Sequence, residues 1–431
     1  MRLGENIGSV YSNRREIQRV FSKGKLVWEK NRIDYNTTAF TVVALADTVV
    51  VEPHYAYKMG NGSPDDVETI ANFKYSINGG EWFESQKNPI NIKKNDVVSL
   101  TGTDIHFCKI TGLSDVYGNI MSLLYGDNFV GQTVWKEIPD GYTTVGFFDS
   151  CDIRKAENLI LPATTLTVEC YAGMFSKCRN LTHAPKLLPA PTLTTYCYSM
   201  MFLNCTSLIA PPVIAATKMG AYCCYEMFRN CTSLTAPPEL PATNLDMWCY
   251  EAMFLNCRSL TTSPELPARS FTYSGVRADG CYSDMFRGCT SLTTAPELPA
   301  NRLVEACYAG MFEGCTSLTT APELPASTIA YNCYNTMFKN CTSLTTAPKL
   351  TSSYLYYACY FDMFYGCTNL NYVKCYAQRL HGSASSYTEC IDGWLDGVSP
   401  TGTFVCVRGT DGGKNPIEDY IPSTWTVEYL N

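Results

Sequence analysis

The sequence predicts a multidomain α+β protein in which a small all-β, sandwich-like domain precedes a solenoid of short repeats. Three observations support this fold class. A Met-Phe pair recurs about every 26 residues, apolar residues around each pair follow a helical period, and β-rich segments precede the first repeat. With 431 residues, the chain is also too long for one ordinary domain.

The repeat is followed most easily through its Met-Phe pair, which recurs at steps of 27, 26, 26, 32, 26, 26 and 26 residues. The methionines are Met174, Met201, Met227, Met253, Met285, Met311, Met337 and Met363. The unit reads roughly C-Y-x-x-M-F-x-(N/G)-C-T-S-L-T-T-A-P-E-L-P-A, and a degenerate copy includes Phe147 and Cys151. We therefore expect nine turns within residues 141–370, the first atypical because it caps the stack.

Each turn is predicted to hold one short helix and one short strand. At about 100° per residue, the repeated residues of the segment from Cys170 to Cys178 share one face, and the variable residues share the other. Asn or Gly usually precedes the second Cys and tolerates the left-handed conformation that ends a helix. The segment from Leu292 to Leu298 suits a strand that its Pro keeps short.

The 22 cysteines fall mainly into two columns, eight residues apart within a turn. Eight helical residues span about 12 Å, whereas a disulfide needs Cα atoms within about 7 Å. We therefore expect buried free thiols that pack in ladders, with disulfides between turns as the open alternative. The repeated Tyr lies beside Phe on the helical face, so we assign it to the core.

The pattern F-x-x-C-x-x-L followed by a Leu-Pro closing turn resembles the BspA-like leucine-rich repeats. The variant with C-Y-x-x-M-F and C-T-S-L-T-T-A-P-E-L-P-A looks like the form found in proteins of gut Bacteroides and their phages. This resemblance covers about half of the chain. It implies a leucine-rich-repeat solenoid that takes part in surface adhesion and host-protein binding.

Residues 1–30 are predicted to form an N-terminal β-hairpin, with apolar runs on both sides of a turn at Ser22 to Lys25. This block is similar to short elements that attach phage tail proteins to the virion. Residues 31–140 are predicted to form the β-sandwich-like domain, with Asn78-Gly79-Gly80 as a hairpin turn. Residues 371–431 lose the repeat and are expected to cap the last turn.

Composition limits the classes of function. The net charge is −7 and Lys and Arg do not cluster, so no nucleic-acid partner is expected. No stretch of 18 apolar residues occurs, so no membrane insertion is expected, and the N-terminus does not read as an export signal. The four His residues are scattered, and no catalytic, phosphate-binding or zinc motif is present. We therefore predict no enzyme, cofactor or metal, although carboxylates far apart in the sequence could still meet as in a glycosidase.

Two features are candidates for binding. Four glutamates hold the same place in successive turns, and Lys186 and Lys349 hold the equivalent place in outer turns. This predicts a ladder of carboxylates at the spacing of neighbouring strands, with a lysine beyond each end. A solvated ladder without function is the alternative. The glutamates are Glu239, Glu265, Glu297 and Glu323. The 32-residue step adds a loop that contains Phe271, Tyr273 and Arg277. This loop is expected either to take part in binding or to be a neutral insertion.

The sequence thus predicts a non-enzymatic adhesin or receptor-binding component of a phage or phage-like tail. The solenoid would bind a host cell-surface glycan or protein, and the N-terminus would bind other virion proteins. The resemblance to tail adhesins also leaves a homotrimer open. This protein would join the virion in the host cytoplasm. The alternative is a bacterial BspA-like adhesion or protein-interaction protein on the cell surface.

Overall fold

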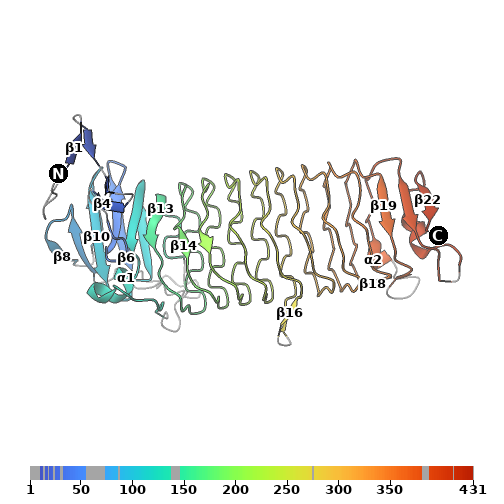
Figure 1. Cartoon of the computed structure of the whole chain (residues 1–431), viewed down its shortest axis with the longest axis horizontal. Coiled ribbons are helices and arrows are strands. Elements are labelled where there is room, and N and C mark those ends of the chain that lie inside the picture. Colours follow the sequence, from blue (N-terminus) through green and yellow to red (C-terminus); the bar gives the residue numbers. More distant parts are fainter. Residues whose placement is uncertain are drawn as a thin grey trace, which may run out of the picture.

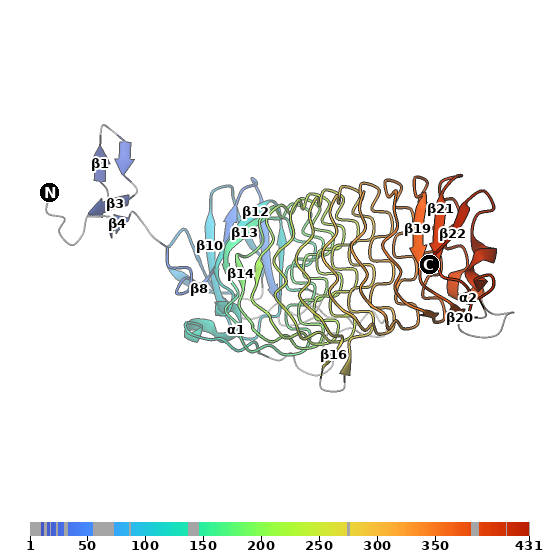
Figure 2. The ribbon, with the colours of Figure 1, turned by 45° about the vertical axis from the view of Figure 1, so that its right-hand side comes forward.

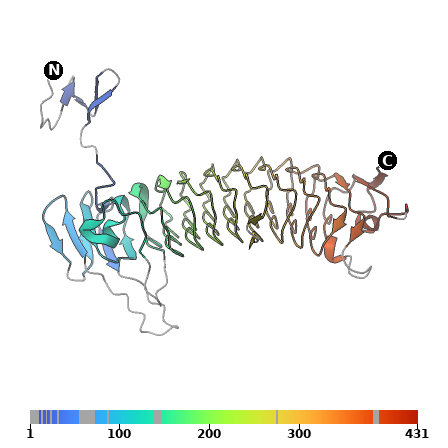
Figure 3. The same ribbon diagram turned by 60° about the horizontal axis from the view of Figure 1, so that its bottom comes forward.

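The protein is an elongated stack of coils with a β-domain at its N-terminal end (Figure 1). The computed structural model describes residues 10–12, 15–17, 19–22, 25–29, 33–54, 73–85, 88–136, 146–273, 276–380, 388–410 and 412–430. From β13 onward the coils follow one another in chain order along the long axis, and the C-terminus lies at the far end (Figures 2 and 3).

Two antiparallel strand pairs lie near the N-terminus. The first joins β1 (Val10–Ser12) to β2 (Arg15–Ile17). The second joins β3 (Arg19–Ser22) to β4 (Lys25–Glu29) and coincides with the predicted hairpin.

The β-domain contains two sheets. One has the order β13-β12-β5-β10-β7-β8 and the other β11-β6-β9. Residues of both sheets, including Phe40, Val42, Val49 and Val51, are buried in one hydrophobic core. The strands are β5 (Phe40–Ala44), β6 (Val49–His54), β7 (Phe73–Ile77), β8 (Trp82–Glu84), β9 (Ile90–Ile92), β10 (Val97–Gly102), β11 (Phe107–Thr111), β12 (Ser114–Asn119) and β13 (Ile153–Ile160). The predicted turn at Asn78 and Gly79 joins β7 to β8 and has positive φ at both residues, as a tight hairpin turn requires.

The β-domain and the coils share one sheet. Strand β13 belongs to the first coil and pairs in parallel with β12, and the Cys108 amide donates to the Phe147 carbonyl at 2.8 Å. The helix α1 (Ser122–Tyr125) and the 3-10 turn η1 (Gly126–Asn128) follow β12. The sheet therefore continues across the boundary that the sequence suggests between residues 140 and 141.

The predicted helix in each turn is wrong. In the segment that holds the Met-Phe pair, amide groups alternate between two kinds of partner. Ala172 donates to Glu169 of the same coil, and the next residue, Gly173, donates to Ser199 of the following coil. In an α-helix every amide would bond within its own segment. These segments are therefore chains of turns, and α-helix in the described residues is confined to α1 and α2 (Thr388–Ile391).

One residue in every four has a positive φ, and this keeps the turns from winding into a helix. In one coil these residues are Ala306, Gly310 and Gly314, with φ of 52°, 61° and 72°. The third position is the Asn or Gly before the second Cys, for which the sequence predicts the left-handed conformation. That conformation is confirmed, although it ends no helix.

The predicted strand is also shorter than expected in most coils. β14 (Leu187–Leu188) pairs in parallel with β15 (Val213–Ile214), and the Ala215 amide donates to Leu188. In the later P-E-L-P coils a Pro replaces Ala215 and has no amide hydrogen to donate. Backbone contacts between these later coils include isolated β-bridges, such as the one between Thr294 and Thr320.

The core of the stack consists of columns of identical side chains. The repeated Phe rings stack on one another, with Phe202 and Phe228 centroids 5.4 Å apart, and the repeated Tyr rings form a parallel column. All 22 cysteines are buried free thiols. The assignment of the Tyr and Cys columns to the core is confirmed. From Cys178 onward, the second Cys of each coil donates its S–H to the Phe carbonyl of the preceding coil, as Cys315 does to Phe286 at 3.1 Å.

The C-terminal segment continues the stack and ends it. Parallel strands β19 (Tyr372–Cys375), β21 (Thr403–Cys406) and β22 (Thr426–Tyr429) form its sheet, and β18 (Tyr354–Leu355) pairs with β20 (Arg379–Leu380). The 3-10 turn η2 (Pro416–Tyr420) lies between β21 and β22 in the chain. Trp394 and Trp425 are buried here against the last coils.

Candidate binding surface

A stripe of exposed side chains runs across seven successive coils. Each member precedes a buried residue that faces the core, and the pairing of Leu187 with Val213 fixes the register at one end. The bridge between Thr294 and Thr320 extends the same 26-residue offset to Glu297 and Glu323. We call this set the 187–349 stripe: Leu187, Val213, Glu239, Glu265, Glu297, Glu323 and Lys349.

The four predicted glutamates form the middle of the 187–349 stripe, and all of them are exposed. Two prolines flank each glutamate, as Pro238 and Pro241 flank Glu239, and their fixed φ angles stiffen the backbone there. A groove of about 540 Å³ lies between two of these coils and is lined by both Glu239 and Glu265. The structure therefore places neighbouring glutamates around a shared concave surface.

The N-terminal end of the stripe differs from the prediction. Strand pairing places Leu187, not Lys186, in the glutamate column, because the coil of Met174 has one more residue before its Leu-Pro-Ala closing turn. Leu187 is 48% exposed and Val213 is 60% exposed. Lys186 lies one position earlier and donates to Asn158 at 3.1 Å. The stripe is thus apolar at one end, acidic in the middle and basic at Lys349.

The inserted loop forms a small hairpin of β16 (Thr272–Tyr273) and β17 (Val276–Arg277), which projects from the edge of the stack (Figure 1). The prediction that Phe271 binds a ligand is corrected by its burial, since the side chain is only 2% exposed. Its ring packs edge-on against Tyr282 and Tyr308. Phe271 is therefore a core residue that fixes the base of the hairpin. The side chains of Tyr273 and Arg277 lie outside the described residues.

A charged ledge that sequence reasoning missed lies on the chains of turns. It consists of Glu226, Arg229, Glu251, Asp284, Arg287, Glu313, Lys339 and Asp362. Arg229 pairs with Glu226, Arg287 bridges Asp284 and Glu313, and Lys339 pairs with Asp362. These residues hold the variable positions of the C-Y-x-x-M-F-x segment, so a comparison of those positions between copies would have revealed the ledge.

Glu251 is the exception on this ledge, because no cation in the described part of the chain pairs with its carboxyl group. Partial burial, together with the nearby charges of Asp284 and Glu226, raises the pKa of Glu251 to about 7. Burial also raises the pKa of Asp284 and of Glu313, while Arg287 opposes both shifts. The ledge is therefore sensitive to pH near neutrality.

Aromatic side chains form a second feature that sequence reasoning missed. Tyr196, Tyr222 and Trp248 hold one position in three successive coils and stack with centroid distances of 4.8 and 6.5 Å. Gly280 follows them in the next coil, where a Cβ atom would lie 2.0 Å from the Trp248 ring. The absence of a side chain at Gly280 therefore leaves room for the indole ring of Trp248.

The described residues offer no group of three or more His, Cys, Asp or Glu side chains placed to hold a metal ion. Of the scattered histidines, His54 and His106 are buried in the β-domain, and burial lowers the pKa of His106 to about 4. No helix in the described ranges has the length and apolar character needed to cross a membrane.

Comparisons with known proteins give one distant likeness. No known protein family matches this sequence, and no curated protein matches it. Among solved structures, a leucine-rich repeat protein from Bacteroides ovatus aligns over 76% of this chain and 96% of its own, with 13% identity and a TM-score of 0.22.

Proposed function

We propose that this protein is a non-enzymatic adhesin, the receptor-binding component of a phage or phage-like tail, and that the side of its coil stack binds a bacterial surface glycan or protein. The observation that carries the proposal is the 187–349 stripe. Seven coils present their side chains in one register, and six steps of about 4.8 Å make a surface roughly 30 Å long.

The chemistry of the stripe suits an extended partner. Exposed Leu187 and Val213 offer apolar contact at one end, and four carboxylates follow. Like charges so close together repel one another, so a partner that supplies cations or hydroxyl donors relieves this repulsion when it binds. An amine-bearing glycan or a protein surface with basic side chains has this character.

The N-terminal strand pairs would attach the protein to other tail proteins, with a homotrimer as one mode of assembly. Their place at the end opposite the C-terminus would leave the side of the stack free for the host surface (Figure 3). The alternative, a BspA-like adhesion protein of a bacterial surface, uses the same stripe. Detection of the chain in purified virions would distinguish the two.

The test is binding of the fluorescently labelled full chain to intact cells of a panel of bacterial strains, gut Bacteroides included. We expect saturable binding to some strains. Replacement of Glu239, Glu265, Glu297 and Glu323 by Gln should weaken that binding at least tenfold. The matched control replaces four exposed carboxylates elsewhere, and it should bind like the original protein: Asp47→Asn, Glu81→Gln, Glu169→Gln and Glu428→Gln.

Two outcomes would reject the proposal: no strain binds the protein, or the two quadruple variants bind equally well. A Tyr273→Ser, Arg277→Ser variant tests the inserted hairpin separately. If it binds normally while the glutamate variant does not, the hairpin is a neutral insertion and the stripe alone is the binding surface.

A further inference from the structure

In the last coil, a row of backbone donors finds no acceptor in the part of the chain that the structure describes. In the coil before it, the amides of Asp362, Phe364 and Gly366 donate to carbonyls of the next coil at 2.8 to 2.9 Å. The residues at the same places in the last coil are Gly393, Leu395 and Gly397. Their amides have no acceptor among the described residues, which form no further coil on this side.

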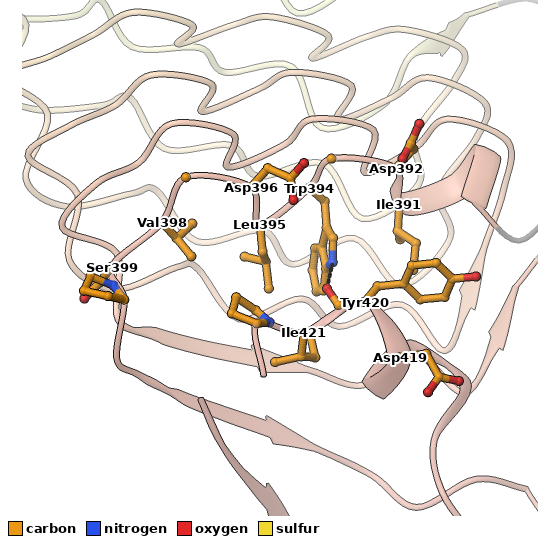
Figure 4. Close-up of a pocket in the computed structure, with 14 residues that line it drawn as sticks. Ile391, Asp392, Trp394, Leu395, Asp396, Val398, Ser399, Asp419, Tyr420 and Ile421 are labelled. Carbon is orange, nitrogen blue, oxygen red and sulfur yellow. Dashed lines mark hydrogen bonds between the residues drawn. The ribbon is translucent and has the colours of Figure 1, made fainter. Parts of the chain in front are cut away.

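All three residues line a groove at the C-terminal end of the stack, in which Figure 4 labels Leu395. Tyr420, Ile421 and Pro422, at the end of η2 and just after it, also line the groove, and Tyr420 and Ile421 lie across it from Leu395 (Figure 4). The indole nitrogen of Trp394 donates to the Tyr420 carbonyl at 3.2 Å and joins the two sides of the groove. The groove has a volume of about 430 Å³, and ligand sites typically measure roughly 300–1,000 Å³.

The groove combines apolar contact with negative charge. The side chains of Leu395 and Ile421 face the same space, and Asp392 and Asp396 lie along its rim (Figure 4). Asp419 stands on the other side and pairs with Lys414 at 2.5 Å. Backbone donors alone would attract an anion, but the two exposed carboxylates of the last coil oppose one. A neutral acceptor with a cation nearby fits better.

The backbone geometry also excludes two arrangements between copies of this chain. Two C-terminal ends placed face to face would present donors to donors. The first coil offers acceptors, but its Phe147 carbonyl already receives the Cys108 amide of the β-domain. A segment of another polypeptide can supply the carbonyl row that a following coil would have supplied.

We propose that this groove binds a short polypeptide segment of a partner protein, which lays backbone carbonyls against the amides of Gly393, Leu395 and Gly397. A Lys or Arg of that segment contacts Asp392 and Asp396. The site lies at the end of the stack, so the inference is independent of the function proposed for its side.

The first test is amide hydrogen exchange of the full chain. Fragments from residues 391–398 should exchange much faster than the matched fragments from residues 360–367, whose alternate amides bond to the next coil. Equal protection of the two segments would show that the last coil is already covered, and the proposal would fail.

The second test pans a display library of random 12-residue peptides against the full chain. We expect selected peptides to be rich in Lys or Arg and to slow exchange in residues 391–398 but not in residues 360–367. The Asp392→Lys, Asp396→Lys variant should bind them at least tenfold more weakly. An Asp47→Lys, Glu169→Lys variant has the same change of charge elsewhere and should bind them normally.

A library that yields no binding peptide would overturn the proposal, as would peptides that leave exchange in residues 391–398 unchanged. Equal affinity of the two charge variants would overturn it too. None of these results bears on the 187–349 stripe. Binding to cells in the absence of any peptide binding would therefore reject this site and leave the proposed function standing.

Discussion

At the scale of the residue, the buried cysteines of the second column act as hydrogen-bond donors. Burial raises the pKa of Cys151 and of Cys333 to about 12, so both stay protonated at neutral pH. A protonated, buried thiol is a poor nucleophile. In the second Cys column the S–H groups meet Phe carbonyls of the preceding coil, which explains why a residue with both small volume and a donor suits that position.

Glu251 gives a prediction about stability and pH. The ordinary pKa of a glutamate carboxyl is 4.5, and in the folded protein the pKa of Glu251 is about 7, so between these values the folded state holds the proton more tightly. Stability is therefore lost as the pH rises through this range. Because the side chain is partly exposed, we expect Glu251→Gln to raise the free energy of unfolding at pH 8 by only about 1 kcal/mol.

Urea unfolding at pH 5 and at pH 8 measures this effect. The increase in the free energy of unfolding caused by Glu251→Gln should be larger at pH 8 and should shrink toward pH 5. Glu297→Gln removes an exposed carboxyl of the stripe and serves as the control for net charge. An equal gain at both pH values would contradict the prediction.

At the scale of the element, the chain of turns depends on residues that accept a left-handed backbone. Asn fills this role in several coils, and its amide also bonds across coils, as Asn230 does to Asn204 at 2.8 Å. Thr336 adopts a φ of 52° although it is β-branched. Such a conformation costs about 1–3 kcal/mol and persists only where the surroundings enforce it. Cross-coil hydrogen bonds provide that enforcement.

Gly314 tests this cost directly. Its φ is 72°, and an added Cβ would approach no atom closer than 3.8 Å, so only backbone strain would change. Gly314→Ala should lower the free energy of unfolding by about 1 kcal/mol. Gly314→Asn should cost less, because Asn tolerates this region and occupies it in neighbouring coils. Urea unfolding of the original protein and the two variants measures these changes. Equal decreases in the free energy of unfolding for the Ala and Asn variants would contradict the prediction.

At the scale of the whole molecule, the stack has ends of different kinds. The β-domain covers the first coil through β12 and the Cys108 amide. At the other end β21 and β22 continue the sheet, while the groove beside Leu395 leaves amides open. Because each coil contacts mainly its neighbours, the stability of such a stack is approximately a sum over coils and their interfaces.

The repeat predicts that a whole coil can be removed. Deletion of residues 307–332 joins Ala306 to Cys333 and preserves the left-handed residue at the junction, since Ala306 and Asn332 have φ of 52° and 56°. We expect a folded protein with an unchanged circular dichroism spectrum per residue and a slightly smaller dependence of stability on urea. Deletion of residues 307–319 breaks the register and should abolish cooperative unfolding. A folded half-coil deletion would show that the stack does not depend on register.

Much of the core was predictable because the same residues recur at the same positions in successive copies of the repeat. The columns of Met, Phe, Tyr and Cys, and the left-handed Asn or Gly positions, follow from aligning the copies. Two site predictions failed where local sequence was ambiguous. Phe271 lies in an insertion, and only its packing on Tyr282 and Tyr308 shows that it is buried. The place of Leu187 in the stripe depends on strand pairing with Val213.

The sequence by itself determined the repeat length, the residues that face inward and the exposure of the four glutamates, since each follows from a period and the side chains that occupy it. Only the tertiary structure decided the backbone path, because the amides that distinguish a turn chain from a helix find their acceptors on another coil. The same holds for the raised pKa of Glu251 and for the amides of Gly393, Leu395 and Gly397. The pKa shift comes from burial and from carboxylates that are 25 or more residues away in the chain, and the open amides come from the lack of a following coil among the described residues. A local sequence pattern contains neither.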